Sequence, residues 1–279
     1  MSSLLDNYVV KAFTKEQFDI TNSKCIEHLI SNEDPDIIIN AAAYTDVDKA
    51  ELNLSIAESI NSNGPMFIAK QLKNTNKLFI HYSTDYVFDG EAKNPYKETD
   101  MPSPINNYGH TKLLGEKYII DSDINYLIFR TTWVYSIGTN NFPNKIIKLY
   151  KKNKPLKIVS DQFGVPTSAK MIADITKECI EKYFSTKDSK LKGIYHLTPT
   201  GATDWYNFSK YIIDELNEKK YFKKTNSIMP CKTDEYKLPA KRPKNSLLNC
   251  NKIKECFNIF LPDWKYHANL FIEEIYKNK

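Results

Sequence analysis

Short apolar runs alternate with amphipathic segments through the first half of the chain. Such runs are typical of strands that are buried on both faces, and they occur at residues 8–13, 36–40, 77–82 and 126–130. Segments with helical spacing of apolar positions separate them, at residues 22–30, 46–58 and 65–73 and from residue 108 onwards. This alternation predicts a parallel α/β sheet with right-handed crossovers.

The pattern is less regular after residue 140. It predicts helices at residues 142–151, 168–183 and 205–218, and strands at residues 156–159 and 193–197. Residues 161–167 are polar and rich in turn-forming side chains, which is typical of a binding loop. The sequence shows no internal repeat and no low-complexity linker. We therefore expect the second half to form a smaller lobe that packs onto the sheet.

Two of the predicted strands end in residues that suit a ligand. The strand at 36–40 runs into three alanines at residues 41–43, and the strand at 77–82 runs into Ser-Thr-Asp at residues 83–85. In parallel sheets, ligands bind beyond the carboxyl ends of the strands. The alanines would let a bulky ligand approach the backbone, and the hydroxyls can converge on one substrate oxygen. His81 is interpreted as a satisfied strand residue.

A tyrosine and a lysine lie one turn apart on the helix that follows these hydroxyls. Side chains at i and i+4 share a helix face, so the Lys112 ammonium can lie beside the Tyr108 phenol and favour its ionised form. The same spacing occurs at residues 150/154, 183/187 and 206/210. Only Tyr108 follows a strand that ends in hydroxyls, which predicts a proton-donor site at this position.

Composition argues against several classes of protein. The net charge of +5 arises from lysines mixed with acidic residues along the chain, so nucleic-acid binding is not expected. No stretch is apolar for long enough to span a membrane, and the first residues lack the pattern of a signal peptide. The five cysteines form no Cys-x-x-Cys pair, so we expect reduced, mostly buried thiols. These features predict a cytoplasmic protein that does not bind membranes.

Two groups of charged residues have candidate roles. Asp46, Asp48 and Glu51 lie in the first turns of a predicted helix, where acidic side chains interact favourably with the helix dipole; no metal site is therefore expected. The two arginines, Arg130 and Arg242, stand among many lysines. They are candidates for sites that need a planar, forked cation.

Taken together, these segments resemble the dTDP-4-dehydrorhamnose reductase family of the extended short-chain dehydrogenase/reductases. The matches recur in order from about residue 8 to residue 264. They are Asn-Ala-Ala-Ala-Tyr-Thr-Asp-Val-Asp-Lys-Ala-Glu at 40–51, Tyr-Ser-Thr-Asp-Tyr-Val-Phe-Asp-Gly at 82–90, Tyr-x-x-x-Lys at 108–112, Arg-Thr-Thr-Trp-Val-Tyr at 130–135, Asp-Gln-x-Gly-x-Pro-Thr at 161–167 and Ala-Lys-Arg-Pro at 240–243.

The resemblance implies a Rossmann-like parallel sheet with a smaller C-terminal substrate-binding lobe. The cofactor domain would comprise residues 1–140 and the lobe residues 141–279, and the strand at 193–197 could return to the sheet. The family uses NADPH, with NADH as an alternative, to reduce the 4-keto group of dTDP-6-deoxy-L-lyxo-4-hexulose to dTDP-L-rhamnose. A homodimer is a further possibility for this chain.

The resemblance also implies roles for individual residues. Tyr108 would protonate the C4 oxygen, Lys112 would hold the nicotinamide ribose and lower the pKa of the tyrosine, and Thr84 would hydrogen-bond the ketone. The other implied cofactor contacts are Asp19, Ile20, Ala41, Ala42, Ala43 and Thr45. The other implied substrate contacts are Val47, Asp85, Tyr86, Trp133 and, for the diphosphate, Arg242.

The sequence bears further on the role of Trp133 and on the choice between NADP and NAD. Trp133, at the end of a strand, could equally be a core residue. Thr14 and Lys15 follow the strand predicted at 8–13, at a position where NAD-binding proteins carry an acidic residue for the ribose 2′-hydroxyl; this favours NADP.

One feature of the family is not matched in the sequence. Family members begin with a strand and a Gly-x-x-Gly-x-x-Gly turn that brings the pyrophosphate to a helix N-terminus, whereas the first glycine here is Gly64. Residues 1–7 correspond to the middle of the first helix of the family, so the chain is expected to begin about 20 residues late. A mis-called start codon, a degenerate copy, or a non-catalytic regulatory subunit resembling the methionine adenosyltransferase beta subunit would each account for this.

Overall fold

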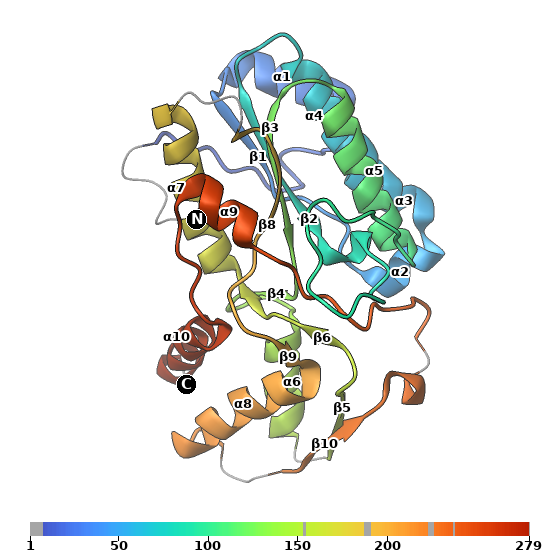
Figure 1. Cartoon of the computed structure of the whole chain (residues 1–279), viewed down its shortest axis with the longest axis vertical. Helices are drawn as coiled ribbons and strands as arrows, with labels where there is room; N and C mark the ends of the chain where they lie inside the picture. Colours follow the sequence, from blue (N-terminus) through green and yellow to red (C-terminus); the bar gives the residue numbers. More distant parts are fainter. Residues whose placement is uncertain (1–7, 153–154, 187–190, 223–225, 237, 279) are drawn as a thin grey trace.

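The computed structural model of the chain describes residues 8–152, 155–186, 191–222, 226–236 and 238–278. Four parallel strands form its central sheet (Figure 1), in the order β1-β2-β3-β8. These strands are β1 (Ile37–Asn40), β2 (Leu78–Thr84), β3 (Asn125–Thr131) and β8 (Gly193–His196). The predicted parallel α/β sheet is therefore confirmed. The predictions for residues 1–7 and for the lysines at 154 and 187 lie outside the described residues.

The strand predicted at residues 8–13 is not formed. Residues 9–13 pair with no strand, and Val9 is 95% exposed. An apolar run becomes a strand only when a neighbour takes up its backbone N–H and C=O groups. Among the described residues, β2 is the only strand that pairs with β1, so no ladder reaches this segment.

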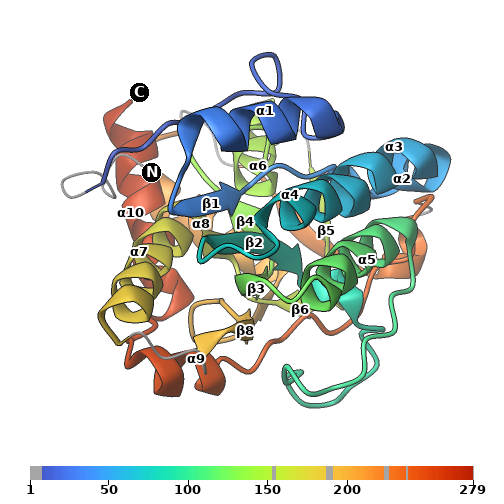
Figure 2. The same ribbon diagram turned by 90° about the horizontal axis from the view of Figure 1, so that it is seen from above.

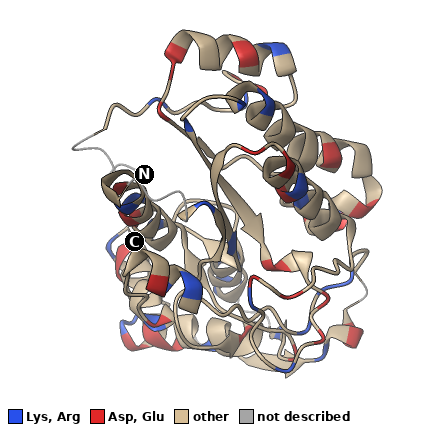
Figure 3. Ribbon diagram, turned by 45° about the horizontal axis from the view of Figure 1, so that its top comes forward, with Lys and Arg blue, Asp and Glu red and all other residues tan. Residues whose placement is uncertain are grey.

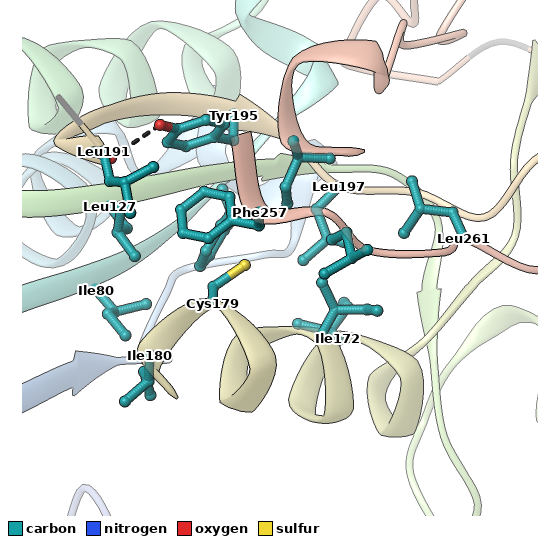
Figure 4. Close-up of a cluster of buried hydrophobic side chains, with 14 of the residues drawn as sticks. Ile80, Leu127, Ile172, Cys179, Ile180, Leu191, Tyr195, Leu197, Phe257 and Leu261 are labelled. Carbon is teal, nitrogen blue, oxygen red and sulfur yellow. Dashed lines mark hydrogen bonds between the residues drawn. The ribbon is translucent and has the colours of Figure 1, made fainter. Parts of the chain in front are cut away.

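Helices cover both faces of the sheet (Figure 2). One face carries α1 (Ser23–Glu33), α4 (Gly64–Leu72) and α5 (Asn107–Asp121), and the other carries α7 (Ala169–Thr186) and α9 (Asn251–Phe257). Figure 4 shows the second face, where Cys179 of α7 points toward Phe257 of α9; Ile180 and the sheet residue Ile80 belong to the same buried cluster. Buried apolar side chains on both faces make the sheet rigid enough to hold side chains at its end.

The helix predicted at residues 46–58 is interrupted. It consists of α2 (Val47–Leu52) and α3 (Leu54–Glu58), and a π-helical turn, η2 (Ser59–Asn63), leads on into α4. Buried Asn61 explains why this turn is retained. Its amide accepts from Tyr44 N over 2.8 Å and donates to Tyr44 O over 3.1 Å, so it fixes the loop that leaves β1.

Apart from the segments that pack on the sheet, the described part of the lobe consists of three two-stranded ribbons and three helices. The ribbons are β4 (Val134–Tyr135) with β7 (Thr167–Ser168), β5 (Leu156–Val159) with β10 (Ile228–Cys231), and β6 (Phe163–Gly164) with β9 (Thr203–Asp204). The helices are α6 (Phe142–Lys151), α8 (Trp205–Glu218) and α10 (Trp264–Lys277). The predicted helix at 142–151 and strand at 156–159 are confirmed, whereas β10 and α10 were not predicted. The lobe has its own apolar core, built from α6, α8 and α10.

Charged side chains are interspersed on the described surface. Figure 3 shows lysines and arginines mixed with acidic residues along the helices of both parts. None of the described helices combines the length and the apolar composition that a membrane crossing requires.

Candidate active site

The carboxyl ends of the sheet strands bring three polar segments together. Asn40 at the end of β1 is in register with His81 of β2, and Thr84 at the end of β2 is in register with Thr131 of β3. A short helical turn, η3 (Asp85–Val87), follows β2 directly. Side chains that are distant in sequence therefore meet at one edge of the sheet.

The first turn of α5 packs closely against η3. Asn106 caps the helix by accepting from Gly109 N over 2.8 Å, and its Nδ2 donates to Lys241 O. A Cβ on Gly109 would lie 2.0 Å from the Tyr86 backbone oxygen, so only glycine permits this approach. As a result, Tyr108 at the start of α5 lies close enough to the end of β2 for Thr84 to act on its pKa.

Asp85 and Tyr86 extend this pair. The Thr84 hydroxyl donates to Asp85 Oδ1 over 3.1 Å, and the Tyr86 ring meets the Tyr108 ring edge-on with centroids 5.5 Å apart. Burial raises the pKa of the Asp85 carboxyl to about 7, although hydrogen bonds from Ser246 and Thr84 oppose the shift. Asp85 Oδ2 has no hydrogen-bond partner among the described residues. It is a buried acceptor without a partner at the edge of the proposed site.

Lys112 does not lie as the helical spacing predicted. Its Nζ donates to Tyr82 O over 2.6 Å and lies 3.1 Å from His81 Nε2. Burial raises the pKa of Tyr108 to about 12, and Lys112 is not among the groups that act on it in this structure. The helical spacing places both side chains on the same face of α5. The position of the Lys112 ammonium, however, is fixed by its contacts with His81 and Tyr82 of β2.

Sequence reasoning did not identify His81 and Asn40 as parts of the site. Both are buried, and Asn40 Nδ2 lies 3.1 Å from His81 Nδ1. The available signal was that Asn40 ends β1 and that His81 lies within β2, shortly before the hydroxyls. A polar side chain that precedes the hydroxyls on the same buried strand needs a partner.

The guanidinium groups of both arginines form paired hydrogen bonds with carboxylates. Arg130 binds Glu116 inside the fold, through Nη2 at 2.6 Å and Nε at 3.0 Å. Arg242 binds Asp48 at 2.7 and 3.2 Å and is partly buried. The Arg242 charge also acts on the half-buried Tyr86 phenol. Arg242 therefore lies near the site, although Asp48 occupies the fork that was expected to bind a diphosphate.

The remaining acidic residues at this end each have an assigned contact. Asp46 caps α2 by accepting from Lys49 N, and Glu51 accepts from Asn107 N at the start of α5. Val47 begins α2, next to Asp48. Across the described residues there is no cluster of three or more side chains that could bind a metal.

Trp133 is both packed and placed beyond the end of β3. Its backbone has φ of +45°, a rare conformation for a large side chain. Its ring stacks on Trp205 with centroids 3.5 Å apart, and a Cβ on Gly164 would lie 2.6 Å from the ring. The lobe thus holds the ring from two sides.

The predicted cofactor residues lie just after the end of β1 and just before the start of α1. Ala41, Ala42 and Thr45 are exposed and Ala43 is half-buried. Asp19 is exposed, but its Oδ1 accepts from the Thr21 backbone and hydroxyl. The Ile20 side chain belongs to the core beneath Gly64. Only the Ile20 backbone is therefore available to an adenine.

Comparisons with known proteins identify the family. The family model described as "RmlD substrate binding domain" matches residues 2–277. The dTDP-4-dehydrorhamnose reductase of Escherichia coli K12 is 38% identical over 258 residues, covering 92% of this chain and 86% of the relative. The spore coat polysaccharide biosynthesis protein SpsK of Bacillus subtilis is 36% identical over 267 residues, covering 96% and 89%.

A solved structure supports the same relationship. The crystal structure of dTDP-4-dehydrorhamnose reductase from Bacillus anthracis in complex with NADP aligns with a TM-score of 0.87 at 32% identity, covering 98% of this chain and 94% of that one. Sequence and fold agree over nearly the whole length of both chains. This chain therefore belongs to the dTDP-4-dehydrorhamnose reductase family.

Proposed function

We propose that this chain uses NADPH to reduce the 4-keto group of dTDP-6-deoxy-L-lyxo-4-hexulose, which yields dTDP-L-rhamnose. The observation that carries the proposal is the close approach of the start of α5, which carries Tyr108, to the residues that follow Thr84 at the carboxyl end of β2. Two hydroxyls at one point can bind a ketone oxygen and stabilise the alkoxide that forms from it. Membership of the reductase family and the NADP complex of a relative support the reaction and the cofactor.

The residues around β1 fit the nicotinamide half of such a cofactor. Ala41 and Ala42 are exposed and carry no bulk beyond Cβ, so a flat ring and a ribose can approach the backbone there. Lys112 lies behind them, one turn along α5 from Tyr108. When bound, NADPH would supply a hydride. No described residue is assigned to the pyrophosphate, because no Gly-x-x-Gly-x-x-Gly turn is present in the sequence.

Tyr108 is the proposed proton donor. Burial raises its pKa to about 12, so the phenol is protonated at neutral pH and can give its proton to the C4 oxygen as that oxygen gains negative charge. The hydroxyl of Thr84 would hold the same oxygen. Lys112, one turn further along α5, would be the nearest cation on that helix for the phenolate left on Tyr108.

The sugar nucleotide would lie between the sheet and the lobe. Asp85 Oδ2 has no partner among the described residues and would accept from a sugar hydroxyl if the side chain turned toward the ligand, and Tyr86, Val47 and Trp133 would enclose the ring. Arg242 would bind the diphosphate by sharing its fork with Asp48 or exchanging it. On this proposal, residues 1–140 carry the cofactor and residues 141–279 contribute most of the sugar-nucleotide contacts.

A matched pair of variants tests the assignment. Tyr206 and Lys210 have the same i,i+4 spacing on α8, but Lys210 pairs with Asp214 in the lobe. With NADPH and the dTDP-keto-sugar, Tyr108→Phe should lower kcat by about 10²- to 10⁴-fold, and Tyr206→Phe should leave it unchanged. The fall in NADPH absorbance measures turnover.

Two results would contradict the proposal. Full activity in Tyr108→Phe would show that another group donates the proton. No NADPH consumption by the unaltered chain, even with saturating substrate, would rule out the reductase and favour a binding role for this family member.

A further inference from the structure

Three side chains behind Tyr108 form a hydrogen-bonded row with almost no solvent access. Asn40, His81 and Lys112 have exposed fractions of 5%, 0% and 1%. Asn40 Nδ2 lies 3.1 Å from His81 Nδ1, and His81 Nε2 lies 3.1 Å from Lys112 Nζ. At the outer end, the Ala42 N–H donates to Asn40 Oδ1 over 3.0 Å. The row joins the loop after β1 to the lysine of the proposed active site.

The Ala42 amide sets the direction of every hydrogen bond in this row. A backbone N–H can only donate, so the oxygen of the Asn40 amide must face it. The Asn40 NH₂ group then faces His81 Nδ1, which must offer a lone pair. A neutral His81 therefore carries its proton on Nε2, the nitrogen that faces Lys112.

This arrangement requires Lys112 to be an uncharged amine. An amine can accept from the His81 Nε2–H and still donate to Tyr82 O, whereas an ammonium has no lone pair. When Lys112 is protonated, His81 must present its lone pair at Nε2 and move its proton to Nδ1. The Asn40 amide must then turn its oxygen toward His81, and the Ala42 N–H loses its acceptor.

Of the ionisable groups in and around the row, Lys112 is the one expected to change its charge near neutral pH. Burial holds the pKa of His81 well below its ordinary value, and Lys112 acts in the same direction. Burial lowers the pKa of Lys112 to about 8, while the Glu116 charge opposes that shift. Glu116 is itself paired with Arg130 of β3, and Tyr108 on the same helix stays protonated in this range. His81 is thus expected to remain neutral and only to exchange tautomers.

We propose that Asn40 and His81 couple the charge of Lys112 to the Ala42 amide, so that a ligand oxygen accepting from this amide favours the Lys112 ammonium. Linkage makes the effect reciprocal: the ammonium equally favours the ligand. The identity of the ligand rests on the proposed function, in which a dinucleotide cofactor lies along residues 41–43. Binding at the end of β1 would then raise the charged share of Lys112, with the largest effect above its pKa of about 8.

The tautomer of His81 tests the network without any activity measurement. The full chain, labelled with ¹⁵N-histidine, is studied by NMR well above and well below the Lys112 pKa, and His81 is assigned in the wild type by side-chain to backbone correlation. We expect a protonated Nε2 and a pyridine-type Nδ1 shift at high pH, and the reverse at low pH. His196 is an internal reference, because its Nδ1 lies 3.0 Å from the Tyr96 carbonyl and must donate.

Two outcomes would overturn the proposal. One is a protonated Nδ1 on His81 at both pH values. The other is an unchanged tautomer while the Lys112 side chain, followed by its own ¹⁵N shift, titrates.

A variant pair separates the network from general structural effects. In Asn40→Asp both side-chain oxygens accept, so Nδ1 of His81 should be protonated across the whole pH range. Asn32→Asp is the matched control, because Asn32 Nδ2 lies 2.9 Å from His28 Nε2 on the exposed face of α1; the His81 signals should not change. A pH-dependent His81 tautomer in Asn40→Asp would contradict the role given to Asn40.

Addition of the cofactor to the same NMR sample tests the link to the dinucleotide separately. Adding NADP⁺ at the higher pH should shift His81 toward the Nδ1–H form. If the tautomer responds to pH but not to NADP⁺, the link from the Ala42 amide to the dinucleotide is wrong while the row itself stands. Turnover assays of Tyr108→Phe would then still decide the proposed function independently.

Discussion

Burial controls the ionisable residues at the carboxyl end of β2. Tyr108, Lys112 and Asp85 lie close together in the fold, and burial is the largest cause of the pKa shift at each of them. It disfavours the charged form in every case, so the phenol and the carboxyl become weaker acids and the ammonium a stronger one. Asp85 is the residue at which this has the clearest consequence for stability.

The substitution Asp85→Asn should stabilise the protein at alkaline pH and have little effect at acid pH. The pKa of Asp85 is about 7 in the folded chain against an ordinary value of 3.8, so folding favours its protonated form. The resulting stability is complete below about pH 4 and is lost as pH rises through 7. The variant avoids that loss, by at most ~4 kcal/mol, and urea unfolding at several pH values measures the difference.

Asp46→Asn is the control for this prediction. Asp46 is an exposed helix cap whose pKa is lowered by its hydrogen bonds to Lys49, so the variant should lose stability relative to wild type as pH rises above the Asp46 pKa. A pH-independent difference between Asp85→Asn and wild type would show that Asp85 does not titrate as a buried carboxyl.

Helix α5 is the element that assembles the site. Gly109 and Gly115 let it approach backbone oxygens of Tyr86 and Asn61, at which a Cβ would lie 2.0 and 2.2 Å away. On its sheet side, Glu116 accepts from Ser83 of β2 and pairs with Arg130 of β3. Tyr108 and Lys112 keep their positions because these contacts fix the helix along its length.

Removing the charge of Glu116 should destabilise the fold strongly. Glu116→Gln leaves the Arg130 guanidinium, which is 2% exposed, without a counter-charge, and breaking a buried pair costs about 3–5 kcal/mol. Asp214→Asn breaks the exposed Lys210–Asp214 pair of α8 and should cost less than ~0.5 kcal/mol. Urea unfolding compares the two. A loss below ~1 kcal/mol for Glu116→Gln would mean that water reaches Arg130.

The sheet and the lobe meet through Trp133 at the scale of the whole molecule. This residue leaves β3 with φ of +45°, and its ring is held by Trp205 and Gly164 of the lobe. Gly164 lies in β6 and Trp205 directly follows β9, and these two strands are paired with each other. The lobe therefore decides where this part of the proposed sugar pocket lies.

Loss of the Trp205 ring should weaken substrate binding and leave cofactor binding unchanged. Stacked aromatic pairs contribute about 0.5–1.5 kcal/mol, so Trp205→Leu should raise KM for the keto-sugar by about 2- to 10-fold, with KM for NADPH unaltered. Trp205→Phe keeps a ring and should show a smaller effect. Equal increases in both KM values would instead indicate a general loss of structure.

Most elements could be predicted because their patterns are local. The helix Phe142–Lys151 and the strand Leu156–Val159 have the predicted bounds, since periodicity and turn residues act within a few positions. Residues 8–13 have the same apolar character but form no strand, because pairing depends on a neighbour that the pattern does not reveal. The break at Asn53 and the π turn also escaped prediction, because Asn61 binds the backbone of Tyr44, 17 positions away.

The sequence by itself determined the family, the parallel sheet and the residue types at the ends of its strands, since motif order and periodicity are properties of the chain alone. Only the tertiary structure decided how those residues interact. It directed Lys112 to His81 and Tyr82, joined Arg242 to Asp48 across 194 positions, and raised the pKa of Tyr108 through burial. Burial and hydrogen-bond partners set these properties, and both exist only once distant segments are packed together.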